Sequence, residues 1–263
     1  MRRRSAQNPP QPPLSPLSRH RLDLVAFARE RLHFHPDPDQ VAALDATTRR
    51  GMLNCCRQWG KSSVVSIRAV HQAFHFERSL TIVAAPSRRQ SGEFILKAAA
   101  LLRELDIRPQ GDGGPDHSLL LPNGSRIVGL PGKDTTIRGY SNVSLLLIDE
   151  AGYVPTRLYE ALRPMTATNP RASIWLLSTP NGRQGFFYEE WIRPDSSWTR
   201  ILRPATECPR IAPDFLAEER RHHSDEAFRQ EYLCEFLLAD TAYFNPESVD
   251  AAFRPYPGNE DAA

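Results

Sequence analysis

The sequence carries the run Cys55-Cys56-Arg57-Gln58-Trp59-Gly60-Lys61-Ser62-Ser63, and this stretch decides which fold we expect. Its last part, Gly60-Lys61-Ser62, is the core of a phosphate-binding loop and opens a helical pattern, although the glycine that usually starts such a loop is absent. A Lys behind a Gly turn can reach β- and γ-phosphate oxygens, and the next Ser hydroxyl can ligate Mg²⁺. The run therefore indicates a nucleotide site. How strongly it supports such a site depends on the residues downstream.

The composition is that of an ordinary globular protein. The 263 residues are enough for one large domain or two small ones, and 40% of them are hydrophobic. A net charge of +2 does not by itself indicate a nucleic-acid-binding protein. Only three residues are lysines, so nearly all the positive charge is guanidinium, which suits the recognition of phosphates and carboxylates. A GC-rich genome explains the same bias without any function.

Three further features are the cysteines, the absence of a long apolar stretch and the composition of the N-terminus. The four cysteines, Cys55, Cys56, Cys208 and Cys234, form no CxxC pair, which indicates reduced thiols in a cytosolic protein without a zinc site. No apolar stretch reaches the roughly 18 residues that span a bilayer. Residues 1–20 are rich in Pro and Arg, which predicts a disordered tail whose arginines either contact nucleic acid or are simply solvated.

The hydrophobic pattern predicts strands that alternate with helices. We expect strands at 51–54, 80–85, 143–148, 173–177 and 198–202, and a hairpin over 118–130 around Pro122-Asn123-Gly124. We expect a helix that begins at Gln40, with Asp39 as its N-cap. Further helices are expected at 22–32, 62–76, 88–105, 156–163, 186–191, 213–223 and 225–236. This alternation predicts an α/β fold with a central, mainly parallel sheet and helices on both faces.

Polar residues directly follow three of the predicted strands. They are the loop itself, Asp149-Glu150, and Ser178-Thr179-Pro180. Ligands of such sheets bind beyond the carboxyl ends of the strands, so these residues predict one shared site. Asp149 can hold Mg²⁺ beside the loop Ser62, and Glu150 can polarise an attacking water. The alternative is an acidic pair that only ends a strand or caps the next helix.

Four other features have both a functional and a plain interpretation. The hydroxyls of Ser178 and Thr179 can sense the γ-phosphate or hydrogen bond to the catalytic water. Alternatively, residues 178–180 only form a turn. Gln40 can pair with both edges of an adenine, or lie at the surface. Arg57 can stabilise charge on the transferred phosphoryl group, or form a salt bridge with a neighbouring carboxylate. Arg138 can contact phosphate or DNA, or be an ordinary surface arginine.

Together these pieces resemble the ATPase domain of phage terminase large subunits, the motors that pump DNA into preformed capsids. The resemblance covers residues 32–236, and the form of the loop without its first glycine is typical of that family. It rests on the following matches: PDPDQ ending in Gln40, Arg57-Gln58-Trp59-Gly60-Lys61-Ser62, Ala85-Pro86-Ser87 with Gln90, Ile137-Arg138-Gly139, LLLIDEAGYV, LLSTPNG, and Glu231-Tyr232-Leu233-Cys234-Glu235-Phe236.

The resemblance implies a P-loop NTPase of the additional-strand type and a set of roles. Gln40 would mark the adenine site, Ser62 and Asp149 would hold Mg²⁺, and Ser178-Thr179-Pro180 would couple hydrolysis to movement. Glu150 would be the catalytic carboxylate, assisted by Lys61 and Arg57. The ATP-binding set implied in full is Gln40, Arg57, Gln58, Gly60, Lys61, Ser62 and Ser63.

The same resemblance implies partners and a domain plan. The partners are double-stranded DNA, a portal protein, a small terminase subunit and further copies in a ring, in the bacterial host cytoplasm and away from membranes. Residues 21–238 would form the ATPase domain. Residues 239–263 resemble the linker to a nuclease domain, too short to contain one, so we expect no DNA cleavage by this chain and a nuclease that is separately encoded, missing or lost.

Two alternatives stay open at this point. One is a helicase or another nucleic-acid translocase with the same core, for which 263 residues leave no room for a second RecA-like half. The other is a nucleotide-binding prophage remnant that does not cycle.

Overall fold

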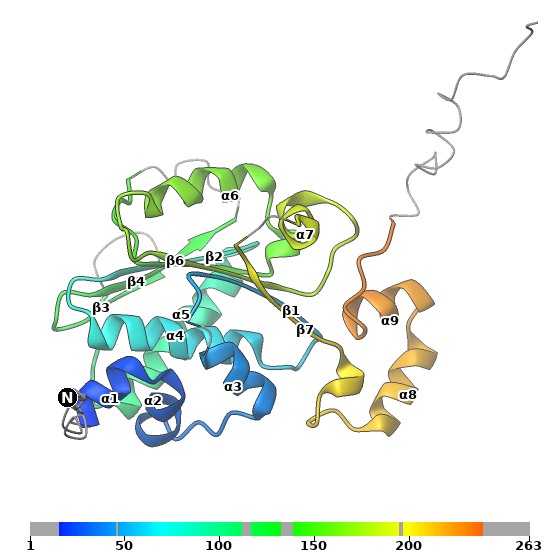
Figure 1. The fold of residues 1–263 in the computed structure, drawn as a ribbon, viewed down its shortest axis with the longest axis horizontal. Coiled ribbons are helices and arrows are strands. Elements are labelled where there is room, and N and C mark those ends of the chain that lie inside the picture. Colours follow the sequence, from blue (N-terminus) through cyan, green and yellow to red (C-terminus); the bar gives the residue numbers. More distant parts are fainter. Residues whose placement is uncertain (1–15, 46, 112–116, 133–138, 195–196, 239–263) are drawn as a thin grey trace, which may run out of the picture.

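Within the residues that the structure describes, seven strands form one sheet with helices on both faces (Figure 1). The structure is a computed structural model, and it describes residues 16–45, 47–111, 117–132, 139–194 and 197–238. The strands are β1 (Arg50–Cys55), β2 (Leu80–Ala85), β3 (His117–Leu120), β4 (Arg126–Pro131), β5 (Leu145–Asp149), β6 (Ser173–Ser178) and β7 (Thr199–Arg203).

The strand order is β3-β4-β2-β5-β6-β1-β7. All neighbours are parallel except β3 and β4, which form the antiparallel hairpin that the sequence predicts. β6 lies between β1, which leads into the loop, and β5, which ends at Asp149. This inserted strand confirms the predicted additional-strand P-loop fold.

The helices cover the two faces of the sheet unequally (Figure 1). One face carries α1 (Pro16–Leu22), α2 (Leu24–Arg31), α3 (Pro38–Asp45), α4 (Lys61–His75) and α5 (Arg88–Glu104). The other face carries α6 (Thr156–Leu162) and α7 (Gly185–Ile192). The last pair, α8 (Pro213–His222) and α9 (Asp225–Glu231), lies beyond the β7 edge. None of the described helices is long and apolar enough to cross a bilayer.

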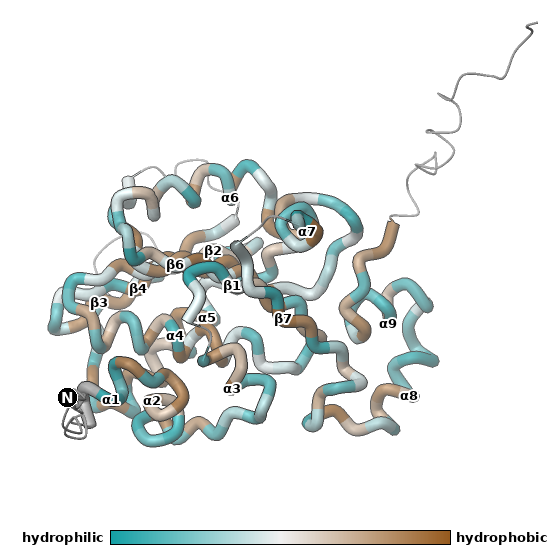
Figure 2. The backbone as a smooth tube through the Cα atoms, in the orientation of Figure 1, coloured by the Kyte–Doolittle hydropathy of each residue, from teal (hydrophilic) through white to brown (hydrophobic). Residues whose placement is uncertain are grey.

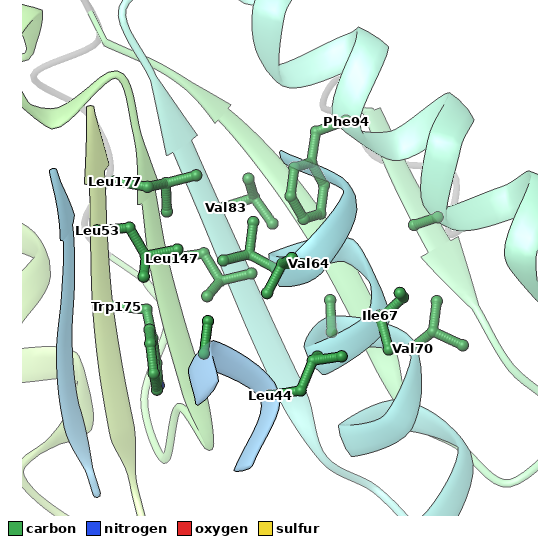
Figure 3. Close-up of a cluster of buried hydrophobic side chains, with 14 of the residues drawn as sticks. Leu44, Leu53, Val64, Ile67, Val70, Val83, Phe94, Leu147, Trp175 and Leu177 are labelled. Carbon is green, nitrogen blue, oxygen red and sulfur yellow. The ribbon is translucent and has the colours of Figure 1, made fainter. Parts of the chain in front are cut away.

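Packing of α4 against the sheet fixes the position of the loop that precedes it. Val64, Ile67 and Val70 on α4 are fully buried at helical spacing. They belong to one hydrophobic cluster with residues of the central strands, among them Leu53 and Leu147 (Figure 3). The strands themselves are predominantly hydrophobic (Figure 2), as expected for a parallel sheet covered on both faces. The start of α4 is therefore held on a rigid base.

The structure corrects three predictions. The predicted tail over 1–20 is wrong from residue 16 onward, because α1 begins at Pro16; residues 1–15 lie outside the described part, as do 239–263. The cap of α3 is Asp37 rather than Asp39, since Asp37 Oδ1 accepts from Gln40 N at 2.8 Å.

The third correction concerns α9, which ends at Glu231 rather than at residue 236. The chain leaves the helix because the backbone beyond it bonds to the sheet side of the molecule. Cys234 O accepts from Asn54 Nδ2 at 3.0 Å, and Tyr232 O accepts from Ala205 N at 2.7 Å. Ser224 is the N-cap of α9, as its Oγ accepts from Ala227 N at 3.2 Å.

Candidate functional site

The segments that follow β1, β5 and β6 meet at one edge of the sheet, as the sequence predicts. The segments that follow β1 and β5 border a cavity of about 640 Å³, which also reaches Pro86, just after β2, and α5, whereas residues 178–180 do not line it. We call it the phosphate cavity. Its lining comprises Arg57, Gln58, Gly60, Lys61, Ser62, Ser63, Pro86, Gln90, Lys97, Glu150 and Tyr153.

The loop requires glycine at its last position before α4. Gly60 has φ 94°, in the left-handed region that side chains rarely adopt. A Cβ there would also lie 2.8 Å from Gln40 Nε2. The next residue, Lys61, is buried, and its Nζ donates to Cys55 O at 2.7 Å and Cys56 O at 3.0 Å. An ammonium has three N–H donors, so one is left for a ligand in the cavity.

The cysteines take the place of the usual leading glycine by packing inward. Cys55 and Cys56 are fully buried and belong to the main hydrophobic cluster, together with Trp59. Burial raises the pKa of the Cys56 thiol to about 12, so it stays protonated. All four cysteines are free, and none is bonded to another. The cysteines of the loop therefore act as small apolar side chains.

Ser62 and Asp149 bring two oxygen ligands together. Ser62 Oγ donates to Asp149 Oδ2 at 3.4 Å. Asp149 is buried, which raises the pKa of its carboxyl to about 6; the charge of Glu150 adds to this rise and Lys61 opposes it. A buried carboxylate next to a hydroxyl favours a hard cation such as Mg²⁺, which prefers oxygen ligands. The two residues therefore fit the magnesium site that the resemblance implies.

Glu150 has an unusual backbone conformation for its residue type. Its φ is 50°, in the left-handed region, and its N donates to Asp149 Oδ1 at 3.1 Å. Its carboxylate Oε2 accepts from Ser178 Oγ at 3.4 Å, and that hydroxyl accepts from Gly152 N at 3.1 Å. Such strained conformations cluster at functional sites. Ser178 thus fixes the carboxylate that lines the cavity.

Thr179 and Pro180 connect the end of β6 to a tyrosine and to α9. Thr179 is buried, and its side chain hydrogen bonds to both Tyr153 and Glu231. The Tyr153 hydroxyl lies 3.4 Å from Pro180 O and 3.1 Å from Glu231 Oε1. The segment that was expected to couple hydrolysis to movement therefore contacts Glu150 through Ser178 and α9 through Thr179.

Arg57 forms a salt bridge with a carboxylate, which is the plainer of the two predictions made for it. Its Nε donates to Glu231 Oε2 at 2.8 Å and its Nη2 to Glu231 Oε1 at 3.3 Å. Burial acts to raise the pKa of Glu231, but the hydrogen bonds from Arg57, Thr179 and Tyr153, together with the charge of Arg57, hold it below its ordinary value. Arg57 nevertheless lines the phosphate cavity, so its phosphoryl role stays a prediction.

Gln40 is buried, and both the nitrogen and the oxygen of its side-chain amide form hydrogen bonds. Nε2 donates to Trp59 O at 3.1 Å, and Oε1 accepts from Asp37 N at 3.3 Å. Gln40 therefore ties α3 to the loop, and its contact with adenine stays a prediction. Arg138, the other predicted phosphate or DNA contact, lies outside the described residues.

Three residues at this site were not predicted from the sequence. Tyr153 and Glu231 form the network around Arg57, and Lys97 reaches the cavity from α5. Lys97 is exposed and has no hydrogen-bond or ion-pair partner within the described part of the chain. The sequence did contain a signal for Lys97, because it is one of only three lysines in an arginine-rich sequence. It shares the lining of the phosphate cavity with Lys61.

Comparison with known proteins places the chain in a family. The sequence model described as "Terminase large subunit, T4likevirus-type, N-terminal" matches residues 52–249. The chain belongs to this family. The matched range includes the loop, Asp149, Glu150 and 178–180.

The chain is also similar, at low sequence identity, to individual terminases. The large subunit of Thermus virus P23-45 is 24% identical, over 82% of this chain and 52% of its own length. The ATPase domain of the Thermus phage P74-26 large terminase has a TM-score of 0.66 at 21% identity, covering 80% of this chain and 97% of that domain. The large terminase of a thermophilic bacteriophage, solved with ATP-gamma-S, has a TM-score of 0.63 at 12% identity, covering 86% of this chain and 53% of that one. The chain spans about half the length of the curated terminases it matches.

Proposed function

We propose that the protein binds ATP with Mg²⁺ and hydrolyses the bond between the β- and γ-phosphates. The observation that carries this proposal is the contact of Ser62 with Asp149 beside a cavity that Lys61 and Glu150 line. Cation ligands, a phosphate-binding lysine and a second carboxylate are the parts that phosphoryl transfer to water requires. The thermophilic phage terminase solved with ATP-gamma-S supports nucleotide binding by this fold.

Each side chain then has a defined task. Lys61 donates its remaining N–H to a β- or γ-phosphate oxygen, while its other two stay on the loop carbonyls. Ser62 and Asp149 would hold Mg²⁺, which offsets phosphate charge when bound. Glu150 orients the attacking water and accepts its proton. Ser178 keeps the Glu150 carboxylate in place through its hydroxyl.

We further propose that this hydrolysis moves double-stranded DNA as part of a phage packaging motor. Membership in the terminase family supports this and favours a packaging motor over a helicase. The motor would include a portal protein, a small terminase subunit and a ring of copies of this chain, in the host cytoplasm. Movement would begin at 178–180, because these residues contact both the catalytic Glu150 and α9.

The experiment is ATP hydrolysis by the purified chain with and without Mg²⁺ and duplex DNA, followed by translocation in the presence of portal-bearing capsids. The proposal predicts Mg²⁺-dependent hydrolysis, stimulated by partners, and movement of intact duplex. Displacement of a strand from a forked duplex would instead indicate a helicase. ATP binding without hydrolysis, with DNA and all partners present, would indicate a protein that does not cycle.

A further inference from the structure

A second cavity, of about 480 Å³, lies at the end of the sheet opposite the phosphate cavity. Its walls are residues 48–50 at the start of β1, the segment 166–174 that leads into β6, and Ser197 just before β7. We call it the basic cavity. Since β1 and β6 are parallel and both lead to the candidate site, the basic cavity is at their amino ends. The six residues of β1 separate it from the phosphate-binding loop by roughly 20 Å.

Two guanidiniums in the basic cavity have no carboxylate partner. Arg49 donates to Pro170 O, and Arg50 Nη1 donates to Ser197 Oγ at 3.2 Å. Among the residues that the structure describes, neither arginine is ion-paired, and no Asp or Glu lines the cavity. A guanidinium has five N–H donors, and each of these uses one, so four remain on each for a ligand.

The surroundings of Arg50 hold the guanidinium in place without neutralising it. Arg50 lies over the ring of the buried Trp198, 6.0 Å from its centroid. Trp198 Nε1 in turn donates to Glu190 Oε2 at 2.8 Å. The Glu190 carboxylate is already paired with two other arginines, Arg163 at 3.6 Å and Arg193 at 3.3 Å. This single buried carboxylate therefore leaves the charge around it positive.

The donors of the basic cavity suit a phosphate group better than a carboxylate or a base. One planar guanidinium satisfies both oxygens of a carboxylate, whereas a phosphate has further oxygens that accept from a second guanidinium. No aromatic side chain lines the cavity within the described residues, so a base finds no stacking surface there. Arg49 is exposed and Arg50 partly exposed, so a phosphate on a larger molecule can reach both.

We propose that the basic cavity binds a phosphate group through Arg49 and Arg50, carried either by the backbone of a DNA duplex or by a small free polyphosphate. This site is separate from the proposed ATP site and does not depend on ATP binding. It lies at the amino ends of β1 and β6, the strands whose carboxyl ends lead to the phosphate-binding loop and to Ser178. A phosphate bound there would therefore contact the strands that also position the candidate catalytic residues.

The first part of the test measures binding of a short DNA duplex by fluorescence anisotropy at several salt concentrations, without nucleotide. The double variant Arg49→Gln with Arg50→Gln should weaken binding about 10-fold or more, by the loss of charged hydrogen bonds. The slope of log K against log salt should fall by about 1, because one phosphate contact is lost. The matched control, Arg103→Gln with Arg108→Gln, removes two exposed charges outside the cavity and should have a smaller effect on both values.

The second part uses the unsubstituted protein, so it does not depend on how well a variant folds. Phenylglyoxal modifies accessible arginines, and mass spectrometry of the digested protein measures the rate at each position. Duplex DNA or inorganic tripolyphosphate should slow the modification of Arg49 and Arg50 but not that of Arg103 and Arg108. The readout is local to these arginines, so tripolyphosphate in the phosphate cavity does not interfere.

The outcomes identify the source of the phosphate or overturn the site. Protection by DNA alone, with selective weakening by the Arg49 and Arg50 substitutions, identifies a nucleic-acid backbone. Protection by tripolyphosphate identifies a free polyphosphate. If neither ligand slows the modification of Arg49 and Arg50, the proposal is wrong, whatever the substitutions do to duplex binding. Protection by DNA alone with equal weakening in both double variants would also overturn it, because the DNA would then only cover the surface.

Discussion

The guanidinium of Arg57 in the phosphate-binding loop is ion-paired with the carboxylate of Glu231 at the end of α9, with Nε 2.8 Å from Oε2. Arg57 also lines the phosphate cavity, so a phosphate there competes with Glu231 for the same cation. The pair therefore links what the cavity contains to the position of α9. Thr179 and Tyr153 hydrogen bond to the same carboxylate, which extends the link to the end of β6.

The first prediction follows from this competition. Glu231→Gln removes the charge that holds Arg57, so we expect ATP to bind more tightly. Arg57 is exposed and Glu231 is partly buried; a pair near the surface contributes about 0–1 kcal/mol, which corresponds to a gain in affinity of up to about 5-fold. Isothermal titration with ATP and Mg²⁺ measures it. Glu235→Gln, which breaks the Arg229–Glu235 pair, is the control and should leave the affinity unchanged. Weaker ATP binding by Glu231→Gln would contradict the competition.

The second prediction concerns Lys97, the cavity residue without a hydrogen-bond or ion-pair partner in the described part of the chain. Its ammonium is close to the space where phosphates would lie, so Lys97→Ala should weaken ATP binding by about 3- to 10-fold. The loss should shrink as salt is raised, because the charge is exposed and screened. Lys97→Arg should restore most of the affinity. Arg103→Ala removes a positive charge from the same helix outside the cavity, and an equal effect there would show that Lys97 has no specific role.

The third prediction is a pH dependence of stability from a buried histidine. Burial lowers the pKa of His71 to about 3, and its Nε2 lies 2.9 Å from His20 O. The unfolded chain takes up a proton near its ordinary pKa of about 6.5, whereas the folded protein keeps the ring neutral. Protons therefore favour unfolding, and the free energy of unfolding should fall by about 2 kcal/mol from this residue between about pH 7 and about pH 5.

Urea unfolding at the two pH values measures this effect. His71→Phe should lose that part of the pH dependence, whereas replacement of the exposed His222 on α8 should not. His75, whose pKa burial lowers to about 4, contributes a second component of the same sign that both variants retain. The same slope in His71→Phe and in the parental protein would show that His71 is not the group involved.

Much of the fold could be predicted because its strands are continuous apolar runs. β2 matches the predicted 80–85 residue for residue, and the turn Pro122-Asn123-Gly124 marks the β3–β4 hairpin. The candidate site could be located for the same reason, since polar residues that end such runs must lie at one edge of a parallel sheet. Local pattern was sufficient wherever one strand or one loop determined the geometry.

Contacts between distant segments could not be predicted. Arg57 and Glu231 are 174 positions apart, and nothing near either residue indicates the pairing. The amide of Gln40 is occupied by Trp59 O, which depends on how α3 packs against the loop. The early end of α9 has the same origin, because Asn54 on β1 binds the backbone that would have continued the helix. Each of these features is set by tertiary structure.

The role proposed for Glu150 is to activate water in an ATP site formed at the ends of β1, β5 and β6. The most direct measurement compares ATP binding and single-turnover hydrolysis by Glu150→Gln with those of the parental protein, using Glu160→Gln at an exposed position of α6 as the control. Loss of a general base predicts retained ATP affinity and hydrolysis slowed by about 100-fold or more. Hydrolysis by Glu150→Gln at the parental rate would contradict this role.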